Sequence, residues 1–380
     1  MRTPVGARAG PSGTKSAPRT ASAPAGGPPA DRRADDAIGP RVTHEVADDL
    51  AADAVARDRA GPAPYDELAR LQEAGLPALL TAPGPRSLDF RTAKDRWLLA
   101  GAVEPPRPEP GRPGLALTPA GCGGYLLDGR GAFASGVTVA DRLVVGARCT
   151  ETGDLLLVLV DPAHPAVTTE PCAERVGQRL AGAGTVAFAR LPVGSGHVLG
   201  ALPRDEHAVT PYATLAPLAL RLLLVHVALG LAEAALAEAR DVSRAGKATA
   251  RPDTDPTAGD DPYLLRAYGE PATSAHTAAA VVGRATDARA RWLLAERVLG
   301  VEERSDIAVL VAAAETVAHR AALEITAQVL QLVAPATTPG LDRFWRNARA
   351  LTAPVPPDHG LRDIGDHYLN GTHARLTLPA

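Results

Sequence analysis

The spacing of apolar and polar positions divides the first third of the chain into three parts. Residues 1–40 have no apolar period and are rich in Pro, Gly, Ser and Ala, which predicts a disordered tail. Residues 41–82 show the spacing of two amphipathic helices and predict an N-terminal helical remnant. Residues 83–114 are interrupted by repeated prolines and predict a stiff linker, with one short helical candidate at 93–99.

Short apolar runs of strand length fill residues 115–205. The run Leu155–Val160 is apolar throughout, whereas Thr185–Leu191 alternates large and small side chains. Gly and Pro turns separate such runs at nearly regular spacing, which is typical of a small antiparallel sandwich or barrel. We therefore expect a central antiparallel β-domain over this range.

Helical periodicity returns in residues 210–375. Small residues recur between larger apolar ones, which favours close antiparallel packing of helices. Helices are expected over four segments, the second with a break near its Gly269-Glu270-Pro271 sequence: Leu215–Ala239, Pro262–Leu299, Asp306–Leu332 and Leu341–Leu351. The fold class is therefore expected to be α+β, with a reduced N-terminal helical region, a central antiparallel β-domain and a C-terminal antiparallel four-helix bundle.

Charge and hydropathy argue against several classes of partner. The chain has 380 residues and a net charge of −3, and it lacks the basic stripe that nucleic acid or an anionic membrane would require. The most apolar run, Leu218–Leu236, contains Arg221, His226 and Glu233, so we expect a buried helix there and not a membrane span. Because the N-terminal tail lacks the apolar segment of a signal peptide, we expect a soluble cytoplasmic protein.

The residues that most often bind metals are scattered. Cys122, Cys149 and Cys172 have neither CxxC nor Cys/His ligand spacing, and they are expected to be small reduced thiols. Two His/acid pairs, at 44–45 and 161–164, stand alone. The sequence therefore predicts no metal site.

Several motifs together resemble one family. They are Gly124–Gly129, Phe133–Gly136, Ala140–Arg142, Gly177–Arg179, Gly184–Phe188, His197–Gly200, Asp260–Leu265, Asp342–Arg349 and Tyr368–Gly371. Their order and composition resemble the acyl-CoA dehydrogenase superfamily, and in particular its flavin-dependent branch that is similar to dibenzothiophene monooxygenase. The resemblance covers residues 115–371 well and 42–82 weakly. Several further N-terminal helices of the family are here replaced by the segment 83–114.

The resemblance implies an activity and partners. It implies a flavoprotein oxidoreductase that holds FAD or FMN between the β-domain and the bundle. A separate flavin reductase would supply reduced flavin, and a small hydrophobic substrate would be oxidised. Pairing through the bundle implies a homodimer or homotetramer.

Four residues are candidates for binding the cofactor. Ser135 matches a serine that lies near the flavin ring in the family, and its alternative is a turn serine that bonds its own backbone. Arg240 and Arg244 match a cation near the cofactor phosphate, and their alternative is a solvated pair at a helix end. Arg349 belongs to the Trp-Arg-Asn-Ala-Arg motif, and its alternative is packing beside Trp345.

The catalytic residues remain unassigned because the chain departs from the family where proton transfer is expected. Leu351 and Pro354 stand where the monooxygenase branch carries two histidines, one of which acts as an acid/base. Asn370 stands where one class of acyl-CoA dehydrogenases has a carboxylate base, and the loop 333–338 has lost its glycines. Two hypotheses therefore stay open: a flavin-dependent monooxygenase, or a catalytically degenerate relative that serves as a binding or oligomerisation partner.

Overall fold

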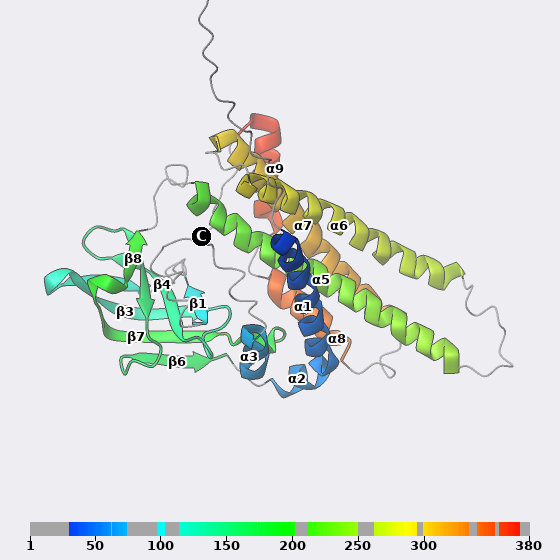
Figure 1. The fold of residues 1–380 in the computed structure, drawn as a ribbon, viewed down its shortest axis with the longest axis horizontal. Helices are drawn as coiled ribbons and strands as arrows, with labels where there is room; N and C mark the ends of the chain where they lie inside the picture. The colour runs from blue at the N-terminus through cyan, green and yellow to red at the C-terminus, as the bar shows by residue number, and fades with distance from the viewer. Residues whose placement is uncertain are drawn as a thin grey trace, which may run out of the picture.

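The computed structural model places a β-sheet domain beside a bundle of long helices (Figure 1). The structure describes residues 30–61, 63–73, 97–102, 114–172, 174–201, 211–249, 262–294, 299–333, 340–353 and 357–372. The first 29 residues of the expected tail, and most of the expected linker, lie outside these ranges.

Three helices form the described N-terminal part. They are α1 (Ala30–Ala52), α2 (Ala54–Ala60) and α3 (Tyr65–Glu73). The expectation of disorder up to residue 40 is wrong from Ala30 onward, because the Ala, Asp and Arg residues there are compatible with a helix. Gly61 ends α2 in a left-handed conformation.

The β-domain is one eight-stranded sheet. Its strands are β1 (Leu99–Ala102), β2 (Ala116–Ala120), β3 (Gly124–Phe133), β4 (Arg142–Cys149), β5 (Leu155–Val160), β6 (Val167–Pro171), β7 (Gly184–Val193) and β8 (Val198–Ala201). The order is β6-β7-β3-β2-β4-β5-β8, and β1 pairs with β4 off this path. Most neighbouring strands of this sheet pair antiparallel, but β1 and β2 each pair in parallel with β4.

Strand β1 corrects two expectations for the segment 83–114. Leu99–Ala102 was expected in a linker, at the end of a short helix, yet it forms a strand in register with Arg142–Val145. A four-residue apolar run carries too little periodicity to distinguish helix from strand, so pairing with β4 decides its conformation. The sheet packs around a core of fully buried side chains: Leu117, Leu127, Leu143, Val145, Val158 and Val186.

The C-terminal half is helical, as expected. Its helices are α5 (Pro211–Thr249), α6 (Pro262–Leu294), α7 (Val301–Leu332), α8 (Asp342–Thr352) and α9 (Pro357–Asn370). Helix α6 continues through Pro271 without the expected break, and α9 is an additional helix that packs against α7. Buried alanines let the long helices approach closely: Ala228, Ala232, Ala235, Ala278, Ala285, Ala314, Ala318 and Ala322.

Within α5, the stretch Leu218–Ala245 is long and apolar enough to span a membrane by length and composition. In this fold the helix packs against α6 and α7, with Leu218, Val225 and Ala232 in the bundle core. The expectation that this run is a bundle helix therefore agrees with its packing.

A charged pair is buried between α5 and α7. The Nη2 of Arg221 donates to Oε2 of Glu315 at 2.6 Å, and both residues are more than 90% buried. One turn further along α7, His319 has a buried Nε2 with no hydrogen-bond partner among the described residues. Burial lowers the pKa of His319 below its usual 6.5, and the Arg221 charge lowers it further, although Glu315 acts in the opposite direction.

We expect His319 to make the fold less stable in acid. Because its folded-state pKa is depressed, the unfolded chain binds more protons once the pH falls to about 6.5 or lower, so stability is highest above that pH and decreases below it. Urea unfolding between about pH 7.5 and 5 should show a smaller decrease for His319→Gln than for the wild type. The exposed His276→Gln serves as control, and an unchanged pH profile in His319→Gln would contradict the assignment.

Candidate functional site

Helix α8 carries the Trp-Arg-Asn-Ala-Arg motif, and its Arg346 joins the N-terminal helices to the β-domain. Arg346 Nη2 lies 2.5 Å from Asp58 Oδ2 in α2, and Nη1 donates to the carbonyl of Val176 at 3.0 Å. Its Nε donates to Asp342 Oδ2 at 2.8 Å, one turn back in α8. Burial disfavours the charge on Arg346, but the bonds to Asp58 and Asp342 outweigh it and raise the pKa of the guanidinium.

The next residue of the motif continues this junction, which we define as Asp58, Val176–Gln178, Arg346 and Asn347. Asn347 Oδ1 accepts a hydrogen bond from the backbone N–H of Gln178 at 2.6 Å. Gly177 lies so close to α8 that a Cβ atom there would come within 2.0 Å of the Arg346 carbonyl oxygen. Only glycine therefore permits this approach. The Gly-Gln-Arg and Trp-Arg-Asn-Ala-Arg motifs, far apart in sequence, meet in one contact.

Helix α8 is also joined to the long bundle helix α5. Both terminal nitrogens of Arg343 bond the carboxylate of Glu238, at 3.0 and 2.5 Å. Such bidentate pairing fixes orientation as well as distance. The motif helix is thus held simultaneously by α2, by the β-domain loop and by α5.

Beside this junction lies a hollow of about 860 Å³ between the α2–α3 connection and the β-domain. We call it the arginine hollow. It is lined by Arg59, Ala60, Gly61, Ala63, Tyr65, Val137, Thr138, Ala140, Pro162, Ala163, Thr169, Pro171, Cys172, Glu174, Arg175, Arg179, Gly182 and Ala183. Its volume lies within the range of about 300–1,000 Å³ that is usual for small-molecule sites.

The walls of the hollow are held by bonds between separate segments. The Tyr65 hydroxyl donates to the carbonyl of Thr138 at 3.0 Å, which fixes the start of α3 against the turn after β3. Arg175 Nη1 donates to the carbonyl of Ala134 at 3.0 Å. Gly182 has φ +61, and a Cβ there would lie 2.7 Å from Thr138 Oγ1, so the glycine leaves that hydroxyl its space. No histidine is among the described residues that line the hollow.

Ser135 lies on the turn that follows β3, two residues before Val137 of the hollow wall. Its side chain is exposed, and it makes no hydrogen bond with any residue that the structure describes. The alternative of a turn serine that bonds its own backbone is therefore not what the structure shows. The hydroxyl remains available to a ligand.

Arg240 and Arg244 are exposed on α5, a helix whose C-terminal end points away from the sheet (Figure 1). Arg240 Nε donates to Asp241 Oδ1 at 2.9 Å, and this bond, reinforced by the charge of Arg244, lowers the pKa of the Asp241 carboxyl. Arg349 is likewise exposed, on α8.

Sequence reasoning selected Arg349 from the motif but missed Arg346 and Asn347, which make the inter-domain bonds. The signal was available in part, because i and i+4 positions share a helix face and Arg346 follows Asp342 by four residues. The partners Asp58 and Gln178 could not be found from spacing.

Of the three positions at which the resembled family transfers protons, the structure describes two. Leu351 lies in the last turns of α8, and Pro354 lies outside the described residues. Asn370 ends α9, where its side chain bonds the Asp366 carboxylate at 2.5 Å. Neither Leu351 nor Asn370 can act as a base.

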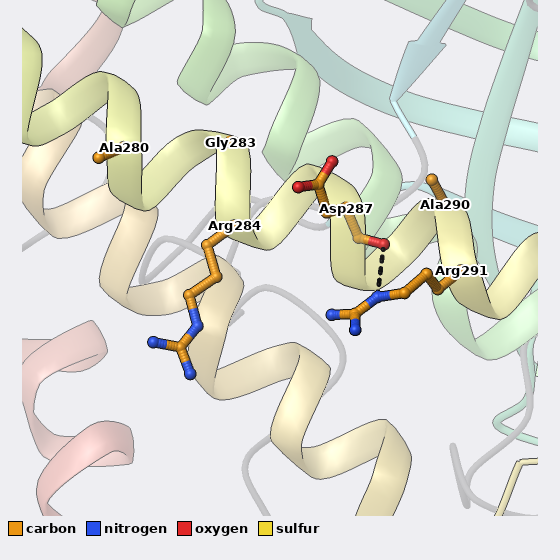
Figure 2. A pocket seen from close by; sticks show the side chains of 6 residues that line it. All are labelled: Ala280, Gly283, Arg284, Asp287, Ala290 and Arg291. Carbon is orange, nitrogen blue, oxygen red and sulfur yellow. Dashed lines mark hydrogen bonds between the residues drawn. The ribbon is translucent and has the colours of Figure 1, made fainter.

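A second depression, of about 580 Å³, lies along one face of α6 (Figure 2). It is lined by Ala280, Gly283, Arg284, Asp287, Ala290 and Arg291, and Arg291 Nε bonds the carbonyl of Asp287 at 3.3 Å. All of these residues come from a single helix. The depression is therefore an exposed helix face with small residues at its centre, and not an enclosed site.

The sequence is similar to those of known proteins over part of the chain. No family model matches it. A segment covering 68% of the chain is 30% identical to dibenzothiophene monooxygenase of Rhodococcus qingshengii, and 64% of the chain is 29% identical to the probable FMNH2-dependent monooxygenase SfnC of Pseudomonas putida. These alignments span 64% and 62% of the respective relatives, which is less than two thirds of their length.

Solved structures agree over a larger part of the fold. The dibenzothiophene monooxygenase TdsC of Paenibacillus sp. A11-2 has a TM-score of 0.77 at 25% identity, covering 90% of this chain and 100% of that one. The same protein with FMN bound has a TM-score of 0.78 at 24% identity, with the same coverage. The α+β fold expected from the sequence is therefore confirmed.

We expect Arg346→Met to lower the free energy of unfolding by about 3 kcal/mol, because Asp58 is left buried without its counter-charge. Arg349→Met in the same helix removes an exposed guanidinium and should change stability by no more than about 0.5 kcal/mol. Urea unfolding of both variants measures the difference. Equal losses would show that the junction contributes no more than a surface arginine does.

Proposed function

The chain is a homologue of the dibenzothiophene-type monooxygenases and has their acyl-CoA dehydrogenase-like fold, and from this we propose that it is a flavin-dependent monooxygenase. It would bind FMN or FAD, receive reduced flavin from a separate flavin reductase, and oxidise a small, largely hydrophobic substrate. The single observation that carries the proposal is the 30% identity over 269 residues.

Features of the chain itself are compatible with a flavin. A flavin needs a hydrogen-bonding group at the edge of its ring and cations near its phosphate. Ser135 offers a free, exposed hydroxyl beside the arginine hollow, in the position matched to the flavin serine. Arg240, Arg244 and Arg349 offer exposed guanidinium groups.

The distribution of these groups favours a site completed by a second subunit. We propose that Ser135 contacts the flavin ring of its own subunit, whereas Arg240 and Arg244 reach the phosphate of a neighbouring subunit's flavin. Arg349 would add a further cation. The bound flavin would supply the activation of oxygen, while the junction of α2, α8 and the β-domain would keep the Ser135 turn in place for the ring.

The alternative function is that of a catalytically degenerate relative. Leu351 at a position where the branch carries histidine favours it, since leucine cannot exchange a proton. Under this alternative the chain would bind flavin or a partner protein without oxidising a substrate.

We also propose that the chain forms a homodimer or homotetramer through its bundle. One side of α5 exposes Leu220, Leu223, Leu224 and Val227, which recur at the spacing of a helix face. An exposed apolar stripe of this kind is typical of an interaction surface. The small residues on the exposed face of α6 would permit a close helix contact beside it (Figure 2).

Flavin titration tests the function. The protein should quench the fluorescence of added FMN or FAD, and Ser135→Ala should weaken binding by about fivefold, the value of one hydrogen bond. Ser195→Ala, another exposed serine in a turn of the β-domain, is the matched control. An absence of flavin binding at high flavin concentration would overturn the proposal.

Oxygen consumption then separates the two alternatives. With a flavin reductase and NADH, oxygen uptake should rise when dibenzothiophene, indole or a related substrate is added. Flavin binding without any substrate-dependent uptake across such a panel would support the degenerate alternative.

We expect Leu223→Glu to convert the oligomer into a monomer of about 39 kDa, because a charge in the apolar stripe would be desolvated on association. Leu361→Glu on α9 is the matched control, since both leucines are 47% exposed. Light scattering coupled to gel filtration measures the masses. An unchanged mass for Leu223→Glu would place the interface elsewhere.

A further inference from the structure

Arginines outnumber acidic residues in the lining of the arginine hollow. Three arginines line it, against a single acidic residue, Glu174, so its described walls carry a net charge of about +2. The chain as a whole carries −3. A concave positive region in a slightly negative protein concentrates anions, because low-dielectric walls focus the field.

The arginines come from two separate segments. Arg59 lies at the end of α2, and Arg175 and Arg179 lie in the loop before β7. Sequence spacing gives no reason for them to meet. The junction at Asp58 and Val176 brings these two segments together, because Arg346 bonds both of them.

The guanidinium groups are not neutralised by ion pairs. Arg175 bonds only neutral oxygens, those of Ala134 and Gln178, and Arg179 Nε bonds the carbonyl of Arg175 at 3.3 Å. Arg59 is exposed, and it forms no ion pair with any residue that the structure describes. By contrast Arg57, two residues earlier, pairs with both Asp53 and Glu67. Arg59 and Arg175 therefore line the hollow without an ion pair to any described residue, whereas Arg179 lies near enough to Asp342 to help lower the pKa of that carboxyl.

We propose that the arginine hollow binds a tetrahedral oxyanion, a phosphate or sulfonate group, carried by a small organic molecule. Guanidinium groups bond such oxygens in a bidentate geometry. The volume of about 860 Å³ leaves room for an organic body beside the anionic group. The anion is a group of the substrate, because the proposed function, on which this inference rests, already assigns the flavin phosphate to Arg240 and Arg244 of a neighbouring subunit. Binding of the anion does not require the proposed oxygen chemistry.

Calorimetric titration with inorganic phosphate and with methanesulfonate tests the site directly. The wild type should bind both anions at low ionic strength, and added chloride salt should weaken the binding. Arg59→Gln and Arg179→Gln should each weaken it by about tenfold, as expected for loss of a charge-assisted hydrogen bond. Arg266→Gln, which removes an exposed arginine of α6, should leave it unchanged.

Folding does not confound this test, because Arg59 and Arg179 are both exposed and neither is part of the junction. Thermal unfolding of each variant checks that point. Failure of the wild type to bind either anion would overturn the proposal, as would equal binding by the wild type and the Arg59→Gln/Arg179→Gln double variant.

Comparing FMN with riboflavin, which lacks the phosphate, identifies the source of the anion. If the wild type prefers FMN and the double variant loses that preference, the hollow holds the flavin phosphate, and the assignment of the anion to the substrate is overturned. If the preference for FMN persists while phosphate and methanesulfonate binding is lost, the hollow holds an anionic group of the substrate. Anion binding without any flavin binding would overturn the proposed function and leave this site intact.

Discussion

The arrangement of the three parts of the chain depends on the bonds of the largely buried guanidinium of Arg346. A guanidinium placed between α2, the β-domain loop and α8 cannot be left unpaired, since an isolated buried charge costs several kcal/mol. Its bonds to Asp58, Asp342 and Val176 satisfy it only when all three segments are present. Because the loop backbone at Gly177 contacts the backbone of α8, the loop cannot move closer to the helix without a steric clash. Orientation of the β-domain relative to the bundle is therefore strongly restrained at this point.

The bundle supplies the rigid support for that junction. Buried alanines on α5, α6 and α7 bring the helix backbones close together, and small side chains leave few alternative packings of the same helices. The pair Arg221–Glu315 lies in this apolar core, where breaking one partner would leave a buried charge. We interpret it as a device that fixes the register of α5 against α7. Arg343 and Glu238 then transmit the position of α5 to the motif helix.

The arrangement separates arginines that maintain the fold from arginines that are free for ligands. Arg57, Arg343 and Arg346 are paired with carboxylates and partly or largely buried. Arg59 and Arg179, on the same segments, face solvent or the arginine hollow. A ligand site directly beside a rigid junction is preorganised. Less binding free energy is then lost in ordering the protein segments that contact the ligand.

The sequence alone determined the type and order of the elements, because helix and strand periodicity are local properties of the side-chain pattern. It also determined the resemblance to the flavin-dependent branch, through motifs such as Gly177–Arg179 and Asp342–Arg349. It misjudged Ala30–Pro40, where the helical pattern is weak, and Leu99–Ala102, where pairing with β4 decides the conformation. Only the tertiary structure decided that Arg346 is a junction residue and that Arg59 and Arg179 line the same hollow. Such contacts join residues more than a hundred positions apart, and their energies depend on burial and distance, which no local pattern encodes.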